Sequence, residues 1–389
     1  MSLLEIYHLK NNPFVIVPRS EPFWADRTKF KADLEAAIQF TLYGTQSQII
    51  ACIYGDWGCG KTHAMNYFSN ENILTNMAEK SGITKEKIPF SIPIIFPTKE
   101  VFNTLYLDIV YKNLIPRLSL ALNYLSQQST ATKTLAGQVM PLEKEGNLKK
   151  KINTIIGNDD LAKVLSQFND RTKNLLVIRY LTKNAVRNDL SKLGIAKGID
   201  TNSEMLTTLT DILKLFTRTC SSRIYIWIDD CERIEELPGR EMFEFQYFLR
   251  DVLDLMPERL TFIVNFTLLP GMAIPERMTY LGPAVQNRIA KIINVSYFDE
   301  QNYLTYVEEL IQNAKRVGDL GTQKYYPFTE KCLKNVFQML EKSTSNLQPR
   351  TVNRVLSLLL ESAVREKVSI IDEEYLDKLK TEIESAMTS

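Results

Sequence analysis

The chain of 389 residues has few of the side chains that build metal centres, and it has almost no net charge. It contains two histidines and five cysteines, and no two cysteines form a CxxC pair, so a zinc site at ordinary ligand spacing is excluded. Lys and Arg number 47 against 46 Asp and Glu, which gives a formal net charge of +1. This balance excludes a strongly basic nucleic-acid coat and leaves room only for a local basic patch.

Long apolar runs are also missing. No stretch reaches the 18 apolar residues that a membrane span needs, and the N-terminal sequence MSLLEIYHLKNNPF lacks the basic start and apolar core of a signal peptide. The composition, 44% hydrophobic and 24% charged with 15 Gly and 15 Pro, is that of a globular chain. We therefore expect a soluble, reduced, cytoplasmic protein without membrane contact.

Short apolar runs rich in β-branched residues alternate with helical patterns over most of the chain. The expected strands are 48–54, 91–98, 223–229, 260–267 and 291–298. A helical pattern over 243–256 connects the third expected strand to the fourth. This alternation predicts an α/β fold of the αβα type, in which helices cover both faces of a parallel sheet.

Two regions depart from the alternation. The segment 99–222, between the second and third expected strands, is longer than one crossover between parallel strands needs. We therefore expect a helical insertion at about 110–218. Its last helix starts with the capping box Thr201 and Glu204. Within it, the lysines at 149–151 are interpreted as a solvated helix face, and only secondarily as a phosphate-binding patch. From Asp299 onward four helical patterns predict a helical lid.

The sequence GDWGCGKT, from Gly55 to Thr62, satisfies the pattern GxxxxGK[ST] between an expected strand and an expected helix. Glycines let backbone N–H groups face phosphates, and the helix N-terminus adds a positive dipole end. Lys61 is expected to neutralise the β- and γ-phosphates of ATP and Thr62 to bind Mg²⁺. Candidate nucleotide-binding residues are Gly55, Asp56, Trp57, Gly58, Cys59, Gly60, Lys61, Thr62 and His63.

The second motif is an apolar run, Ile224 to Ile228, that leads into two carboxylates. In a parallel sheet the carboxyl ends of the strands face the ligand, so Asp229 is expected to bind Mg²⁺ and Asp230 to act as the base for the attacking water. Many buried strands end in an acidic turn, and the pattern gains its meaning from the phosphate loop upstream. Together the two motifs predict binding and hydrolysis of ATP.

The two motifs resemble those of the AAA+ ATPases, and more narrowly their prokaryotic origin-recognition-like and STAND-like members. GDWGCGKT and IDDCER (228–233) are also similar to the KAP-type P-loop NTPases, although those usually have transmembrane segments in the insertion. The resemblance implies an AAA+ core over 31–298, a lid over 299–389 and an adenine-bordering segment over 1–30. That segment includes Asn12-Pro13-Phe14 and Trp24-Ala25-Asp26-Arg27.

The resemblance also implies roles for three polar residues. Asn265 matches the sensor-1 position that orients water, Arg288 matches the arginine that reaches a neighbouring subunit's nucleotide, and Arg350 matches the sensor-2 arginine of the lid. Competing candidates are Arg277 for the trans arginine and Thr351 or Arg354 for sensor-2. A strand-end turn residue, a surface ion pair and an ordinary helix start are the plain alternatives.

The sequence departs from the common AAA+ pattern at Asp230, where most active members have Glu. The shorter side chain puts fast hydrolysis in doubt, and Glu232 is the alternative base. We expect an ATP-hydrolysing switch that self-associates as a ring or filament with nucleotide. It would act on DNA or a protein effector in a transposition, mobile-element or defence system. The alternative is a catalytically slow scaffold in which ATP is structural.

Overall fold

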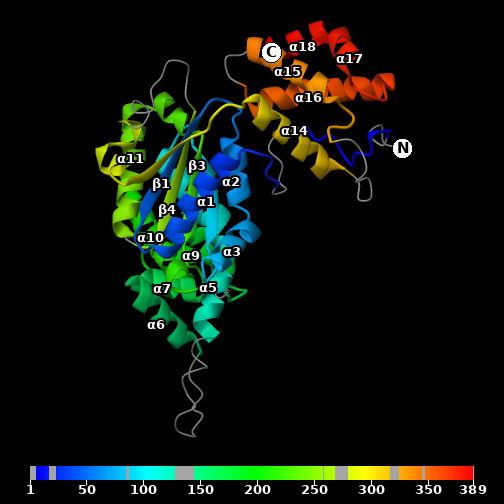
Figure 1. Cartoon of the computed structure of the whole chain (residues 1–389). Helices are drawn as coiled ribbons and strands as arrows, with labels where there is room; N and C mark the ends of the chain where they lie inside the picture. The colour runs from blue at the N-terminus through cyan, green and yellow to red at the C-terminus, as the bar shows by residue number, and fades with distance from the viewer. Residues whose placement is uncertain are drawn as a thin grey trace. The chain divides into compact units, whose positions relative to one another are not determined.

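A computed structural model of the chain describes residues 6–16, 23–84, 87–127, 144–256, 258–267, 279–315, 324–343 and 347–388. Its contacts divide the chain into two compact units (Figure 1). Unit 1 consists of Met1–Leu34, Tyr54–Tyr67 and Ile293–Ser389, and unit 2 of Glu35–Ile53 and Phe68–Ile292. The functional division predicted at residues 30 and 298 stays a prediction.

The fold contains a five-stranded parallel sheet with the strand order β2-β3-β4-β1-β5. Figure 1 labels β1, β3 and β4 of this sheet. Its strands are β1 (Gln48–Gly55), β2 (Phe90–Ile95), β3 (Ile224–Asp229), β4 (Leu260–Thr267) and β5 (Ile289–Asn294). The predicted α/β class is therefore confirmed. The second strand stops at Ile95 rather than at 98, and Pro97, which has no N–H to donate to a ladder, follows shortly after.

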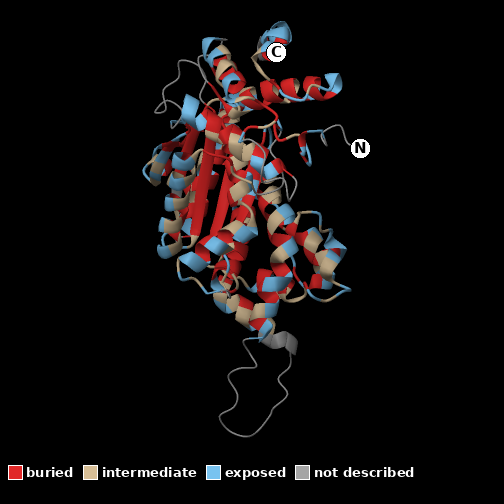
Figure 2. Cartoon of the chain, turned by 45° about the vertical axis from the view of Figure 1, so that its right-hand side comes forward, coloured by how far each residue is buried: buried red, intermediate tan, exposed pale blue. Residues whose placement is uncertain are grey.

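Strand β3 lies between β2 and β4 and is buried at every position. Figure 2 shows that much of the sheet is buried. Side chains alternate along a strand, so Tyr225 and Trp227 point to the same face as Asp229. The Tyr225 hydroxyl lies 2.9 Å from the Thr41 hydroxyl, and the Trp227 ring stacks on Phe68 at 6.4 Å. These contacts fix the strand that ends in the acidic motif.

Helices cover the sheet, and the described insertion consists of helices joined by loops, as predicted. The helices that precede or flank β2 are α1 (Thr28–Tyr43), α2 (Lys61–Phe68), α3 (Glu71–Lys80) and α4 (Val101–Ile109). The insertion continues with η2 (Val110–Leu114), α5 (Ile115–Gln127), α6 (Lys144–Ile156), α7 (Asp159–Ser166), α8 (Asn174–Leu181), α9 (Arg187–Leu193) and α10 (Asn202–Arg218). After β3 come η3 (Cys231–Glu236), α11 (Gly239–Leu255), η4 (Thr279–Leu281) and α13 (Pro283–Gln286).

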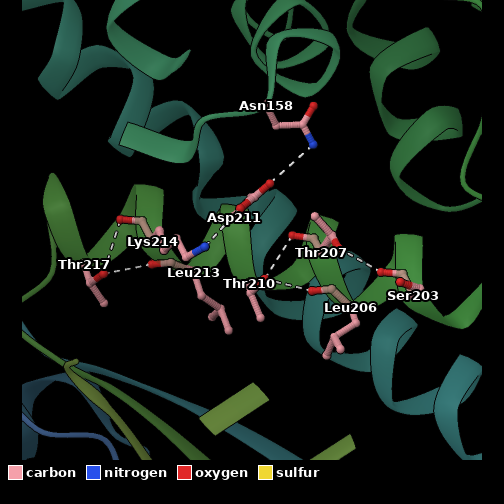
Figure 3. A network of polar contacts seen from close by, with 9 residues as sticks. All are labelled: Asn158, Ser203, Leu206, Thr207, Thr210, Asp211, Leu213, Lys214 and Thr217. Carbon is pink, nitrogen blue, oxygen red and sulfur yellow. Dashed lines mark hydrogen bonds and ion pairs between the residues drawn. The ribbon is translucent and has the colours of Figure 1, made fainter. Parts of the chain in front are cut away.

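Helix α10 has a buried carboxylate in its middle. It begins at the predicted capping box, where the Glu204 amide donates to the Thr201 hydroxyl at 3.2 Å. Asp211 is only 3% exposed; it accepts a hydrogen bond from the Asn158 side-chain amide and pairs with the Lys214 ammonium, each at 3.3 Å (Figure 3). Burial raises the pKa of Asp211, although Lys214 opposes the shift.

The C-terminal part of unit 1 is helical, as predicted for a lid. Its helices are α14 (Glu300–Ala314), α15 (Glu330–Ser343), α16 (Pro349–Glu366), α17 (Glu373–Lys378) and α18 (Lys380–Thr388). The last predicted helix is interrupted at Leu379, which separates α17 from α18. In the N-terminal segment, the Asn12 side-chain amide donates to Ser357 and Glu361 of α16 at 2.7 and 3.0 Å.

Replacing Asp211 by Asn tests the buried carboxylate. Because the raised pKa means that the folded state holds the proton more tightly than the unfolded state, Asp211 costs stability as pH rises through its folded pKa. We expect the melting temperature of Asp211→Asn, relative to wild type, to increase between about pH 4 and about pH 7.

Asp170→Asn is the matched control for this prediction. Hydrogen bonds from Thr172 lower the pKa of Asp170, so its contribution to stability changes only below about pH 4, and the relative melting temperature of Asp170→Asn should stay flat between about pH 4 and about pH 7. Parallel pH profiles for both variants would contradict the assignment.

Candidate functional site

The phosphate loop lies in unit 1 and runs from Gly55, the last residue of β1, to Thr62 in the first turn of α2. Gly58 has φ 81° and Gly60 has φ 107°, conformations that glycine adopts without steric cost. Among the described residues, nothing lies within 4 Å of where a Cβ on Gly60 would stand. The loop therefore leaves open space beside its main chain, where an anion can approach backbone N–H groups.

Lys61 is buried inside this loop, with 7% of its surface exposed. Its ammonium donates hydrogen bonds to the carbonyl oxygens of Gly55 at 2.7 Å and Asp56 at 3.0 Å. The lysine is also the first residue of α2, so its charge lies at the positive end of the helix dipole. Both charges favour a bound anion at the loop.

Cys59 and His63 serve packing. Burial raises the pKa of the Cys59 thiol, although Lys61, whose ammonium is 3.7 Å from the sulfur, opposes the shift. Burial lowers the pKa of His63, whose ring lies 5.6 Å from Trp24. A protonated thiol is a poor nucleophile, and the roles of Cys59 and His63 toward a nucleotide stay predictions.

The start of α16 contacts the phosphate loop. The Arg350 amide donates to the Gly58 carbonyl at 3.4 Å, and a Cβ on Gly58 would stand 2.6 Å from the Arg350 Cβ. The Tyr297 hydroxyl donates to the Asp56 carboxylate at 2.7 Å. The predicted sensor-2 residue therefore borders the loop. The sequence does not reveal these contacts, because they join segments far apart in the chain.

The segment predicted to border adenine packs near the same loop. Asp26 and Arg27 both have positive φ, 41° and 56°. The Arg27 guanidinium lies over the Phe298 ring at 4.3 Å and donates to the Ser296 carbonyl, and burial lowers its pKa. Trp24 contacts Tyr67 of α2 at 5.1 Å. These contacts anchor the segment, and its role toward adenine stays a prediction.

In unit 2, strand register brings Asp229 and Asn265 together. Ile228 of β3 pairs with Val264 of β4 in parallel register, so the next residues, Asp229 and Asn265, are neighbours with side chains on one face. The Asn265 amide donates to the Asp229 carboxylate at 2.9 Å, and both side chains are buried. The predicted sensor-1 residue thus orients the predicted metal ligand.

The two other carboxylates at the end of β3 have different partners. Asp230 has φ 56°, in the left-handed region, and accepts a hydrogen bond from the Arg233 guanidinium at 2.9 Å. Glu232 accepts from the Thr267 amide at 3.0 Å, and its other carboxylate oxygen is buried with no hydrogen-bond partner among the described residues. Sequence reasoning missed Arg233, although its i,i+3 spacing from Asp230 was a signal for an ion pair.

The predicted trans arginine is engaged within the chain. The Arg288 guanidinium pairs with Asp254 and donates to the Arg250 carbonyl at 3.5 Å. Its plain alternative, a surface ion pair, is therefore the arrangement in this structure. The competing candidate Arg277 lies outside the described residues.

The described residues contain neither a cluster of metal-binding side chains nor a helix that could span a membrane. No group of three or more His, Cys, Asp or Glu is placed to hold a metal ion. Mg²⁺ at a nucleotide site needs only one or two protein ligands, because phosphates and water supply the rest, and the roles of Thr62 and Asp229 toward this ion stay predictions. No described helix combines the length and apolar character needed to cross a bilayer.

Comparison with protein families identifies the domain. The model of the KAP family P-loop domain matches residues 27–266. The chain belongs to the KAP family. The matched range contains the phosphate loop, the acidic end of β3 and Asn265, which are the parts of the site that the two motifs predicted. No curated protein matches this KAP-family chain.

Solved structures share the fold of this KAP-family chain. The Aeropyrum pernix ORC1 protein, solved in complex with DNA, aligns with a TM-score of 0.50 and 12% identity, over 96% of this chain and 69% of that one. The Aeropyrum pernix ORC2 protein in its ADP form aligns with a TM-score of 0.54 and 12% identity, over 98% and 73%. The predicted resemblance to origin-recognition-like ATPases is confirmed at the level of the fold.

Gly58→Ala tests the contact between α16 and the phosphate loop. The new Cβ would overlap the Arg350 side chain and force a left-handed alanine, which alone costs about 1–2 kcal/mol. We expect a lower melting temperature and faster hydrogen exchange at the Arg350 amide, because its bond to the Gly58 carbonyl is lost.

Gly82→Ala is the matched control. Gly82 has φ 76°, but a Cβ there meets nothing within 4 Å among the described residues, so only the backbone strain remains. Equal destabilisation by both substitutions, with unchanged exchange at Arg350, would show that the contact is unimportant.

Proposed function

We propose that this KAP-family chain is an ATP-dependent molecular switch that binds ATP with Mg²⁺, hydrolyses it and self-associates in the nucleotide-bound state. The observation that supports this most is the buried ammonium of Lys61 inside a glycine loop with open space at Gly60. The ammonium and the backbone N–H groups of the loop together provide the donors that a phosphate chain requires.

Each candidate residue has a distinct task in the proposed reaction. Backbone N–H groups of the loop bind the phosphates, and Lys61 neutralises their charge. Thr62 and Asp229 hold Mg²⁺, which supplies electrostatic stabilisation to the transferred phosphoryl group. Asn265 holds Asp229 in place, and Asp230 or Glu232 accepts the proton of the attacking water.

Lys61→Ala should abolish ATP binding while the chain stays folded. Fluorescent ATP titration and calorimetry measure the affinity, and circular dichroism checks the fold. Lys163→Ala is the matched control, because the Lys163 ammonium also bonds to a backbone carbonyl, that of Gly194 at 2.6 Å, but lies outside the loop. An affinity unchanged by Lys61→Ala would refute the proposed nucleotide site.

We further propose that the switch acts on DNA or on a protein effector in a transposition, mobile-element or defence system. The shared fold with a protein solved on DNA supports this only by analogy. The lysines at 149–151 add little, since Lys149 pairs with Asp159 at 2.8 Å and Lys151 donates to the Leu125 carbonyl at 2.6 Å. Any DNA contact would come from many copies assembled side by side. A cytoplasmic location also stays a prediction.

Nucleotide-dependent assembly is measured by sedimentation velocity with a non-hydrolysable ATP analogue. Wild type should sediment as a ring or filament, and Lys61→Ala should remain small. Arg288→Ala should weaken assembly if Arg288 leaves Asp254 to reach a neighbouring nucleotide, whereas Arg218→Ala, which removes an exposed pair with Glu258, should not. Wild type that stays monomeric at saturating nucleotide would contradict assembly.

A scaffold in which ATP is structural is the second candidate. It is favoured by one observation, the ion pair that holds the shorter carboxylate of Asp230. Equal, background rates of phosphate release by wild type and Asp230→Ala, with ATP still bound, would favour the scaffold over the switch.

A further inference from the structure

We infer that Arg233 is a brake on ATP hydrolysis: its ion pair with Asp230 withholds this carboxylate from the attacking water until the pair opens. The inference rests on the proposed ATPase function and adds a form of regulation to it. Arg233 is a positioning residue in this scheme, since it acts through Asp230.

The geometry makes the pair a closed local unit. Asp230 follows β3 in a left-handed conformation, φ 56° and ψ 37°, and caps the short helix η3. The Arg233 amide donates to the Asp230 carbonyl at 3.1 Å, and the Arg233 guanidinium donates to the Asp230 carboxylate at 2.9 Å. Asp230 and Arg233 are therefore joined by one main-chain and one side-chain hydrogen bond, which together fix the direction of the Asp230 carboxylate.

The ion pair is partly exposed. The Arg233 and Asp230 side chains are 37% and 25% exposed, so solvent screens the pair in part and it can open. At the neighbouring carboxylates, the Asn265 amide donates to Asp229 and the Thr267 amide donates to Glu232. Arg233 brings a full positive charge to Asp230, whereas these amides bring dipoles.

The ion pair with Arg233 hinders Asp230 from acting as the base for the attacking water. In hydrolysis, water attacks the γ-phosphorus, the bond to the ADP oxygen breaks, and a carboxylate accepts the proton of the water. While the guanidinium holds the carboxylate at 2.9 Å, Asp230 cannot turn toward the attacking water. A 3₁₀-helix has poorer hydrogen-bond geometry than an α-helix, so η3 can rearrange and release the pair without disruption of the sheet.

Steady-state phosphate release by the full chain tests the brake. We expect Arg233→Ala to raise kcat roughly twofold to fivefold, the size expected for one partly exposed ion pair, with KM unchanged. Arg233→Lys should stay near the wild-type rate, because an ammonium can keep the ion pair. Asp230→Ala with Arg233→Ala should be no faster than Asp230→Ala alone, because the brake acts only through Asp230.

Arg218→Ala is the matched control, since it removes an arginine from an exposed ion pair with Glu258 in the same unit. The brake is overturned if Arg233→Ala leaves kcat unchanged or lowers it while melting temperature and ATP affinity match wild type. An equal rise in Arg218→Ala, or a rise that persists without Asp230, also overturns it. If Arg233→Ala does not fold, Arg233→Gln gives the same test.

Titration with fluorescent ATP separates failure of the brake from failure of the proposed function. If wild type and every variant bind no ATP, the proposed function is wrong and the brake falls with it. If all bind ATP and Arg233→Ala still releases no phosphate, the nucleotide site stands and the brake is wrong.

Discussion

The parallel pairing of β3 with β4 is the constraint on which the acidic site depends. Once Ile228 lies opposite Val264, the next pair must be Asp229 and Asn265, and alternation puts both side chains on one face of the sheet. A buried carboxylate at that position requires a donor, which the Asn265 amide supplies. A slip of one residue in register would bury Asp229 without Asn265, so packing of the whole sheet protects this single contact.

The phosphate loop depends on close approach rather than on register. Gly58 needs both a positive φ and the absence of a Cβ, because the first turn of α16 lies against it, whereas Gly60 needs its conformation and leaves space. Gly58 and Gly60 of the same motif are thus required for different physical reasons. One admits a neighbouring helix, and the other leaves room for a ligand. This difference explains how a loop open to anions can still be packed tightly on its other side.

The sequence was sufficient for features set by local patterns. All five strands, the strand–loop–helix context of GDWGCGKT and the capping box at Thr201 were predictable because apolar periodicity and glycine spacing are local signals. Contacts between distant segments were not, so Tyr297 on Asp56 and the start of α16 on Gly58 appear only in the fold. Side-chain pairing at a turn lies between these cases, since spacing allowed the pair of Asp230 and Arg233 but did not require it.

In the proposed ATPase, two features at the end of β3 would favour slow hydrolysis, and they differ in kind. The short side chain of Asp230 is fixed by the sequence, but its ion pair with Arg233 is a contact of moderate exposure that can open. At this site, the proposed switch would differ from the proposed scaffold in how long the ion pair between Asp230 and Arg233 stays closed. Because such a pair contributes little net stability, a partner that binds the Arg233 guanidinium can open it at small cost. Regulation of turnover then needs no rearrangement of the buried contact between Asp229 and Asn265.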